Sequence, residues 1–287
     1  MSGWIYILLS ASFSVLIAHL LKVIEFRKFN TIKVLTINYL VATFVAFATS
    51  NKGGPILESE TGNLFAAGTL AVFTGFIFIA NFFIYSKSVN LNGVGISVAA
   101  MRISLIVPVL LSTLWYLEYI SVAQWIGVML VFVTLFLLLP DKGRLIREPF
   151  SAGWLLVLLF LGTGFGDAAL KIYESDFSGT WVKQQFMGMV FLTAFMSGLT
   201  ILVFRKDLRF TMKDFWMGAA IGVPNLYTSI FLIEALERMN GAVVYSAVNV
   251  ITVLGATILG ILRWGDRLNL FQWAGIVFTL ISILLLI

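Results

Sequence analysis

The chain lacks cysteine, contains a single histidine and carries few charges. Without cysteine it can form neither a disulfide framework nor a thiolate metal site, and one histidine without an HExxH motif argues against a zinc centre. Asp, Glu, Lys and Arg make up 11% of the 287 residues, whereas soluble domains contain about 25%. So few charges could not cover the surface of a soluble protein of this length. We therefore expect a protein embedded in lipid, with no metal and no cofactor.

Apolar residues are abundant, at 60% of the chain, and the mean hydropathy is +1.00. A helix that crosses a bilayer needs about 20 apolar residues. Ten segments approach this length, and they lack the alternation typical of barrel strands. They lie at residues 3–21, 31–50, 64–86, 93–115, 120–139, 152–172, 182–204, 213–236, 241–262 and 268–287. All eight tryptophans fall near the ends of these segments, as expected for the aromatic belts at the two membrane surfaces.

The sequence repeats itself, because residues 93–139 align with residues 241–287 without a gap. The informative matches are Asn92-Gly93 with Asn240-Gly241, Glu118 with Asp266, and Gln124-Trp125-Ile126-Gly127 with Gln272-Trp273-Ala274-Gly275. Each half holds five predicted helices, and an odd number places the second half upside down in the membrane. We predict an all-α integral membrane protein of ten transmembrane helices, built as two inverted five-helix repeats over residues 1–140 and 151–287. Inverted repeats are typical of secondary transporters, whose substrate site lies near the midplane.

Lysine and arginine mark one side of the predicted membrane protein. The even-numbered connectors hold Lys52, Lys171, Lys183 and Arg238. The odd-numbered connectors hold Lys22, Arg27, Lys28, Lys33, Lys87, Lys142, Arg144, Arg147, Arg205, Lys206, Arg209, Lys213, Arg263 and Arg267. The positive-inside rule therefore predicts cytoplasmic odd connectors and two external termini, in the plasma membrane, here a bacterial inner membrane. The net charge of +5 is then a topology signal, and no nucleic-acid partner is expected.

The stretch from Asn92-Gly93 to Leu139, with its copy from Asn240-Gly241, resembles the paired EamA domains of the drug/metabolite transporter superfamily. In that family an acidic turn precedes a closing helix with a Gln-x-x-Gly element, and a proline is common in the penultimate helix. Here the proline is Pro108, and the second copy has Ala256 instead. The resemblance implies ten helices around a central cavity and transport of amino acids, sugars or other metabolites, including export. Family members typically have cytoplasmic termini, whereas the distribution of Lys and Arg predicts external termini for this chain. The resemblance therefore does not indicate whether this protein exports or takes up its substrate.

Arg102 is the cation placed closest to the middle of a predicted span. An arginine stays charged, and a charge within the hydrocarbon costs about 2.5–3.5 kcal/mol on insertion scales. It therefore needs an anion, carbonyl oxygens or cavity water. Two interpretations stay open: Arg102 anchors an anionic group of a substrate, or it forms a structural ion pair. Its repeat mate is Val250, so this positive site would be asymmetric.

Asp167 and Lys171 lie four residues apart in the sixth span, which puts them on one helix face where they can pair. Alternatively, Asp167 partners Arg102 or carries a coupling proton. Three glycines precede the pair, at Gly162, Gly164 and Gly166, so this helix is expected either to pack closely or to bend.

Two further titratable residues lie within spans. Glu234 is expected to form an interfacial salt bridge with Arg238 one turn later, and a proton-carrying role is the alternative. His19 can titrate near neutral pH or sit satisfied at the interface. The candidates for ion or proton coupling are thus Asp167, Lys171, Glu234 and His19.

Uncharged polar and aromatic residues inside spans should face the bundle interior, because lipid cannot satisfy them. They either join helices or line a cavity, and for the set as a whole we favour a polar and aromatic cavity. Pro224 could kink the eighth helix, and Gly218 with Gly222 is expected to be a packing face. The predicted substrate-binding residues are Arg102, Asn38, Tyr39, Asn81, Tyr85, Gln184, Asn225, Tyr227, Tyr245 and Asn249.

These features predict a secondary transporter that moves a small polar metabolite by alternating access. The expected partners are a small-molecule substrate and the lipid bilayer, and the transporter acts as a monomer or a homodimer. Coupling to a proton and passive exchange both stay open. The alternative is an integral-membrane enzyme or flippase that acts on a lipid-linked substrate. The chain has no zinc motif, no G-x-S-x-G elbow and no second histidine for a triad, so an enzyme is not expected.

Overall fold

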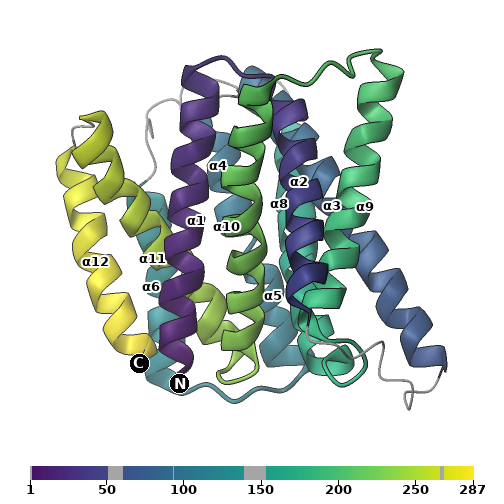
Figure 1. The fold of residues 1–287 in the computed structure, drawn as a ribbon. Helices are drawn as coiled ribbons and strands as arrows, with labels where there is room; N and C mark the ends of the chain where they lie inside the picture. The colour runs from purple at the N-terminus through teal and green to yellow at the C-terminus, as the bar shows by residue number, and fades with distance from the viewer. Residues whose placement is uncertain (1, 51–60, 93, 139–152, 266–267) are drawn as a thin grey trace.

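The computed structural model describes residues 2–50, 61–92, 94–138, 153–265 and 268–287, and within these ranges the regular structure is helical (Figure 1). The helices are α1 (Gly3–Phe26), α2 (Thr31–Thr49), α3 (Thr61–Asn92), α4 (Val94–Ile103), α5 (Ile106–Leu110), η1 (Leu111–Trp115), α6 (Val122–Leu138), α8 (Gly153–Ile172), η2 (Tyr173–Phe177), α9 (Lys183–Phe204), α10 (Met212–Leu236), α11 (Gly241–Leu259), η3 (Gly260–Trp264) and α12 (Leu270–Leu286). The three η segments are π-helical turns. Eight spans are long and apolar enough to cross a membrane, and the apolar helices α6 and α12 are shorter. Each of the ten predicted segments corresponds to one of these, which confirms an all-α membrane protein.

The repeated Gln-x-x-Gly element has a structural purpose. Gln124 and Gln272 accept hydrogen bonds from the backbone N–H groups of Ser121 and Asn269, and both of these residues in turn cap the helix. Such a reciprocal capping box satisfies backbone donors that the first turn of a helix leaves free. The closing helix of each half, α6 and α12, therefore begins in the same way.

The glycine of the same element packs the two closing helices together. A Cβ on Gly127 would lie 3.1 Å from the Leu286 side chain, and a Cβ on Gly275 would lie 2.9 Å from Leu138. Gly127 and Gly275 are repeat mates, and so are Leu138 and Leu286. The α6–α12 contact is therefore the same in both directions, as a twofold relation between the halves requires.

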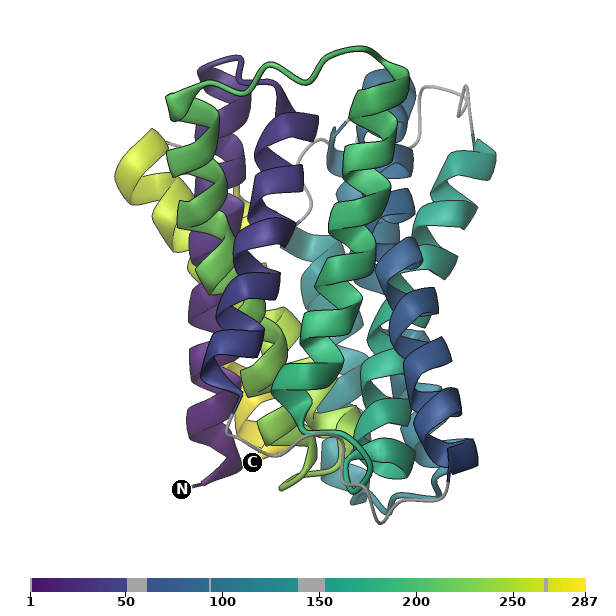
Figure 2. The same cartoon turned by 45° about the vertical axis from the view of Figure 1, so that its right-hand side comes forward.

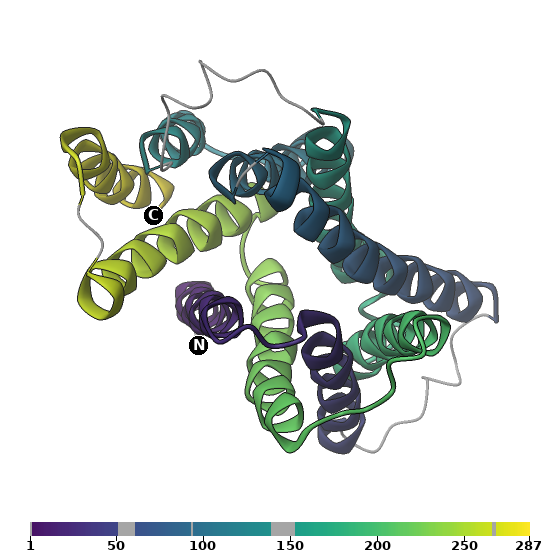
Figure 3. The same ribbon diagram turned by 90° about the horizontal axis from the view of Figure 1, so that it is seen from above.

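The other contacts between halves come in matched pairs. α1 packs on α10 as α8 packs on α3, and α2 packs on α10 as α9 packs on α3. The two termini lie on one side of the bundle, and the α9–α10 connector crosses the other side (Figures 1 and 2). Seen from above, α3 and α11 are strongly inclined whereas α1 is viewed nearly end-on (Figure 3). These features agree with ten helices in two inverted five-helix repeats.

The fourth predicted span is interrupted, and Pro108 explains the position of the break. A proline has no N–H and its ring clashes with the carbonyl four residues earlier, here that of Ser104. α4 ends at Ile103, and α5 starts at Ile106. The backbone N–H groups of Leu105 and Val107 bond three residues back, to Arg102 and Ser104. The mate of Pro108 is Ala256, which lies within the unbroken α11, so this break belongs to the first half.

The glycines of the sixth span pack closely and do not break the helix. α8 is continuous, and a Cβ on Gly164 would lie 2.6 Å from Val107 of α5. α10 is also one helix through Pro224, and Gly218 and Gly222 lie against α2 as expected for a packing face.

Some features used in the sequence analysis lie outside the described residues. They are Gly93, Asp266 and the connector cations Lys52, Lys142, Arg144, Arg147 and Arg267. The division into repeats over 1–140 and 151–287 stays a prediction in its exact limits.

Candidate functional site

Arg102 lies in the last turn of α4, directly before the break, and reaches across to the second half of the chain. Its Nη1 donates a 3.0 Å hydrogen bond to Oδ1 of Asn249 on α11. The guanidinium also interacts electrostatically with Asp167 on α8 and with Tyr85 on α3. A cation is favourable at the C-terminal end of a helix, whose carbonyl groups are not all paired. The discontinuous helix therefore presents Arg102 within the bundle.

The residues of the second half that surround Arg102 also form hydrogen bonds with one another. Tyr245 is 1% exposed and donates a 2.7 Å hydrogen bond to the backbone oxygen of Asp167. The Asn249 amide donates to the Tyr245 carbonyl one turn earlier. We call Arg102, Asp167, Tyr245 and Asn249, together with Tyr85, the central cluster. It unites five residues predicted separately, from α3, α4, α8 and α11.

The remaining predicted asparagines join pairs of helices. The Asn225 amide donates a 3.2 Å hydrogen bond to Oδ1 of Asn38, which links α10 to α2. The Asn81 amide donates a 2.8 Å hydrogen bond to Thr163, which links α3 to α8. Nδ2 of Asn38 and Oδ1 of Asn81 are buried without a protein hydrogen bond. The side-chain amides of Asn38 and Asn81 thus join helices, and each has one polar atom without a protein hydrogen bond.

The predicted aromatic residues outside the central cluster lie in stacks. Tyr39 stacks on Phe191, with ring centroids 6.0 Å apart. Tyr227 stacks on both Phe13 and Phe231. These contacts join α2 to α9 and α10 to α1.

Gln184 lies apart from these groups, near the start of α9. Its Oε1 is buried without a protein partner. The structure thus does not bring Gln184 to the central cluster.

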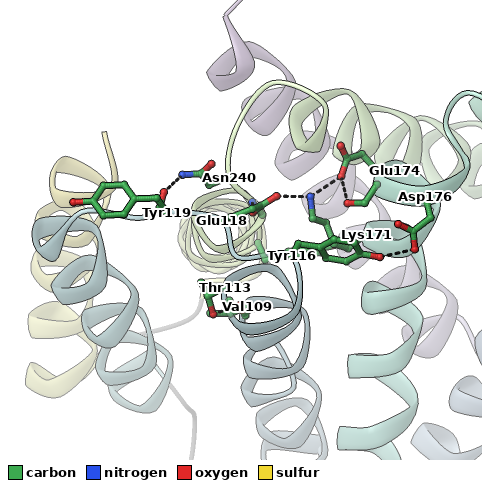
Figure 4. A network of polar contacts seen from close by, with 12 residues as sticks. Val109, Thr113, Tyr116, Glu118, Tyr119, Lys171, Glu174, Asp176 and Asn240 are labelled. Carbon is green, nitrogen blue, oxygen red and sulfur yellow. Dashed lines mark hydrogen bonds and ion pairs between the residues drawn. The ribbon is translucent and has the colours of Figure 1, made fainter.

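Lys171 does not pair with Asp167, and the expectation from their spacing is wrong. Its Nζ lies 2.5 Å from Glu118 and 2.6 Å from Glu174, and the side chain is 2% exposed (Figure 4). The spacing between Asp167 and Lys171 allowed a pair on one helix face, but two carboxylates at the end of α8 hold the lysine instead. Asp167 is left to interact with Arg102, which was the alternative.

The residues around Lys171 form a network on the side of the termini. Glu118 also accepts a 2.6 Å hydrogen bond from the backbone N–H of Gly241. Tyr116 donates a 2.8 Å hydrogen bond to Asp176 (Figure 4). Burial and this hydrogen bond raise the pKa of the Tyr116 phenol above its ordinary value, so Tyr116 remains the donor.

The salt bridge expected for Glu234 is present, at 2.6 Å from Arg238. Lys183 joins it, with its Nζ 2.7 Å from both Glu234 and Glu237. His19 lies in the last two turns of α1, on the side of the cationic connectors. Neither Glu234 nor His19 is part of the central cluster as defined above.

Several residues that carry these contacts were not among the predicted site residues. Glu118 was assigned to the acidic turn of the family, but no ion-pair partner was predicted for it. No role was predicted for Glu174. Lys33 was counted as a connector charge, but it is buried at the start of α2 and pairs with Asp207 at 2.5 Å. Lys33 and Glu118 lie beside helix ends, and their partners Asp207 and Lys171 are far away in sequence. Glu174 lies three residues after Lys171, so helical spacing could have indicated that pair.

Two apolar grooves are present, and no residue of the central cluster lines either of them. One, of about 860 Å³, lies between α3 and α9, and the other, of about 370 Å³, lies between α5-η1 and α8. No predicted substrate-binding residue lines either groove. Among the described residues, no three His, Cys, Asp or Glu side chains gather as metal ligands would.

Comparisons with known proteins agree with this architecture. An uncharacterized protein of Haemophilus influenzae is 29% identical over 281 residues, which are 94% of this chain and 93% of that protein. A solved crystal structure matches with a TM-score of 0.72 over 98% of this chain and 97% of that chain, at 13% identity. This likeness shows the fold. The apolar helices and this shared fold identify a multi-pass, all-α membrane protein.

A family comparison matches the second half of the chain. Residues 151–287 match the model of the EamA-like transporter family, part of the drug/metabolite transporter superfamily, and the resemblance stated from the sequence is confirmed. The second half of this membrane protein is thus similar to the EamA-like transporter family.

Proposed function

We propose that this protein is a secondary transporter that moves a small polar metabolite, such as an amino acid, a sugar or a related solute, by alternating access. The observation that carries the proposal is Arg102, a cation inside the bundle that bonds across the halves to Asn249. A site between two inverted repeats can face either side of the membrane when the halves rock. Arg102 is then the anchor for a carboxylate or another anionic group of the substrate.

The surroundings of Arg102 fit an exchangeable anion. Its direct hydrogen-bond partner, Asn249, is a neutral amide, and Asp167 interacts with it electrostatically. The guanidinium has five donors in a planar fork that suits a carboxylate. A substrate anion can therefore accept hydrogen bonds from the guanidinium N–H groups of Arg102 that do not bond to Asn249. Asp167 offsets the positive charge of Arg102 when no substrate is bound.

The first experiment screens metabolites for those that raise the thermal midpoint of the purified protein, then measures counterflow of a stabilising compound in sealed vesicles. Arg102→Gln should abolish both the thermal shift and the flux, and Arg102→Lys should weaken them because the planar fork is lost. Arg238→Gln is the matched control, since Arg238 lies at the membrane edge, paired with Glu234, and should leave binding intact.

Retained affinity and flux in Arg102→Gln would remove the anchor assignment. Conversion of a lipid, or its movement between leaflets, without metabolite flux would replace the transporter proposal by the lipid-linked alternative.

A further inference from the structure

We propose that Glu118 and Lys171 form a latch that closes the transport pathway on the side of the termini, and that the latch must separate when the protein opens to that side. The inference rests on the proposed transport function and adds the residues that decide which side the pathway faces. The latch comprises Tyr116, Glu118 and Tyr119 of the η1–α6 connector, with Lys171, Asp176, Asn240 and Gly241 of the second half.

The η1–α6 connector of the first half is attached to the second half by four polar contacts (Figure 4). Glu118 pairs with Lys171 at 2.5 Å and accepts from the Gly241 N–H at 2.6 Å. Tyr116 bonds to Asp176, and the Asn240 amide bonds to the Tyr119 carbonyl at 2.5 Å. Since the two halves must move against each other in alternating access, these contacts cannot all persist in both states.

The two partners of Lys171 make its release from Glu118 reversible. Glu174 belongs to the same half as Lys171 and stays with it when the halves part. A buried lysine without a partner would be costly, but here one carboxylate remains in each state. The side chain of Glu118 is already 19% exposed, so its carboxylate can be hydrated once the ion pair with Lys171 is broken. Separation thus leaves no buried charge unpaired.

The latch lies one helical turn from the central cluster, on the same two helices. Lys171 follows Asp167 by four residues on α8, and Gly241 precedes Tyr245 by four residues on α11. One turn of a helix advances about 5.4 Å. The Tyr245 hydrogen bond to the Asp167 carbonyl ties these helices together at the level of the cluster. Any shift of α8 against α11 that a substrate causes there is therefore carried directly to the latch.

The absence of cysteine makes the latch testable without knowledge of the substrate, because one introduced cysteine reports on its own position. Ser112→Cys places a thiol beside the latch: Ser112 is fully buried, its hydroxyl has no protein partner, and it lies against Gly241. Ser88→Cys places a second thiol near the end of α3, towards the opposite side, in a site that is also fully buried. Each reporter is labelled in sealed vesicles with a membrane-impermeant thiol reagent applied to the face concerned.

Glu118→Gln should raise the labelling rate of the Ser112→Cys reporter about tenfold, which corresponds to ~1.4 kcal/mol between the two states. It should lower the labelling of the Ser88→Cys reporter, because opening one side closes the other. Lys171→Gln should act alike, and combining it with Glu118→Gln should add little, since both act through one contact. Glu237→Gln is the control: this carboxylate lies on the same side but pairs within the second half, and it should change neither rate.

A rise at both reporters in Glu118→Gln would show general loosening and overturn the latch, and so would unchanged labelling at both. Should Glu118→Gln fail to fold, Tyr116→Phe removes one contact across the halves and should shift the two reporters in the same opposite directions, to a smaller extent. Unmoved reporters in a protein that still transports would overturn the latch alone. Reciprocal reporters in a protein without metabolite flux would overturn the proposed function alone.

Discussion

At the scale of single residues, Asp167 is the titratable group best placed to couple transport to a proton. It interacts electrostatically with Arg102, whereas Lys171 and Glu234 are held by ion pairs towards the side of the termini. Protonation of Asp167 adds one positive charge to the site, and binding of a substrate anion to Arg102 adds one negative charge. Each event therefore offsets the change in net charge that the other makes. This reciprocity is the requirement for coupling between two bound species.

We expect Asp167→Asn to abolish accumulation driven by a pH gradient while exchange of substrate across the membrane continues. The measurement is uptake of labelled substrate into vesicles with and without an imposed gradient, compared with counterflow at equal pH. Glu234→Gln, the matched carboxylate, should leave both signals intact. Gradient-driven accumulation that survives in Asp167→Asn would exclude it as the proton carrier.

The same residues show how far sequence reasoning reaches. The Glu234–Arg238 pair was predicted correctly because one turn of a helix fixes the geometry of both partners. The same rule failed for Lys171, since Glu118 lies in the other half and spacing along α8 carries no information about it. Arg102 was selected from its depth in a span, but its partner Asn249 depends on how α4 meets α11.

At the scale of helices, close packing between α10 and α2 depends on the absence of side chains at two positions one turn apart. A Cβ on Gly222 would lie 2.7 Å from the Asn38 carbonyl oxygen, and one on Gly218 would lie 2.6 Å from Ile37. Backbone atoms cannot yield as a flexible side chain would. The helices are therefore expected to separate when either glycine acquires a methyl group.

Gly222→Ala should destabilise the protein by ~1–3 kcal/mol, the usual cost of overpacking. The measurement is the thermal midpoint of the purified protein in detergent. Gly68→Ala on α3 is the control, because its Cβ would meet only the Trp181 ring at 3.8 Å. That change should be neutral or stabilising, since alanine favours helix over glycine by about 1 kcal/mol. Equal losses in both variants would contradict the packing argument.

The positions of the helices could be predicted better than their ends. The first and third spans were expected at 3–21 and 64–86, but α1 continues to Phe26 and α3 runs from Thr61 to Asn92. Hydropathy identifies only the apolar part of a helix. The backbone hydrogen bonds of the helix continue beyond that part, so the helix ends later than the hydropathy indicates. The break after α4 was not predicted, although Pro108 lies just beyond it; a bend was considered at the glycines of α8 instead, and α8 is continuous.

At the scale of the whole molecule, the distribution of cations makes a prediction about orientation. The described cations of the odd-numbered connectors, among them Arg205 and Lys206, lie at the α1–α2, α3–α4, α9–α10 and α11–α12 ends, opposite the termini (Figure 1). We infer that this face is cytoplasmic and that both termini are external. The latch around Glu118 would then lie on the external side.

Single cysteines test this orientation in intact cells. A membrane-impermeant thiol reagent should label Ser2→Cys directly, whereas Arg205→Cys should be labelled only after the membrane is permeabilised. The native chain supplies no background, because it has no cysteine. The opposite pattern would place the termini in the cytoplasm, and the latch would then close the cytoplasmic side.

The reciprocal contact of Gly127 with Leu286 and of Gly275 with Leu138 has a consequence for assembly. An interface that uses the same residues on both partners is isologous, the kind that relates the subunits of a symmetric dimer. Here both partners belong to one chain and face opposite ways. A single five-helix polypeptide inserted in both orientations could make this contact with itself, so the fold is equivalent to an antiparallel, dual-topology homodimer joined into one chain. Within one chain each half can differ from the other, and here the first half has Pro108 and Arg102 where the second has Ala256 and Val250.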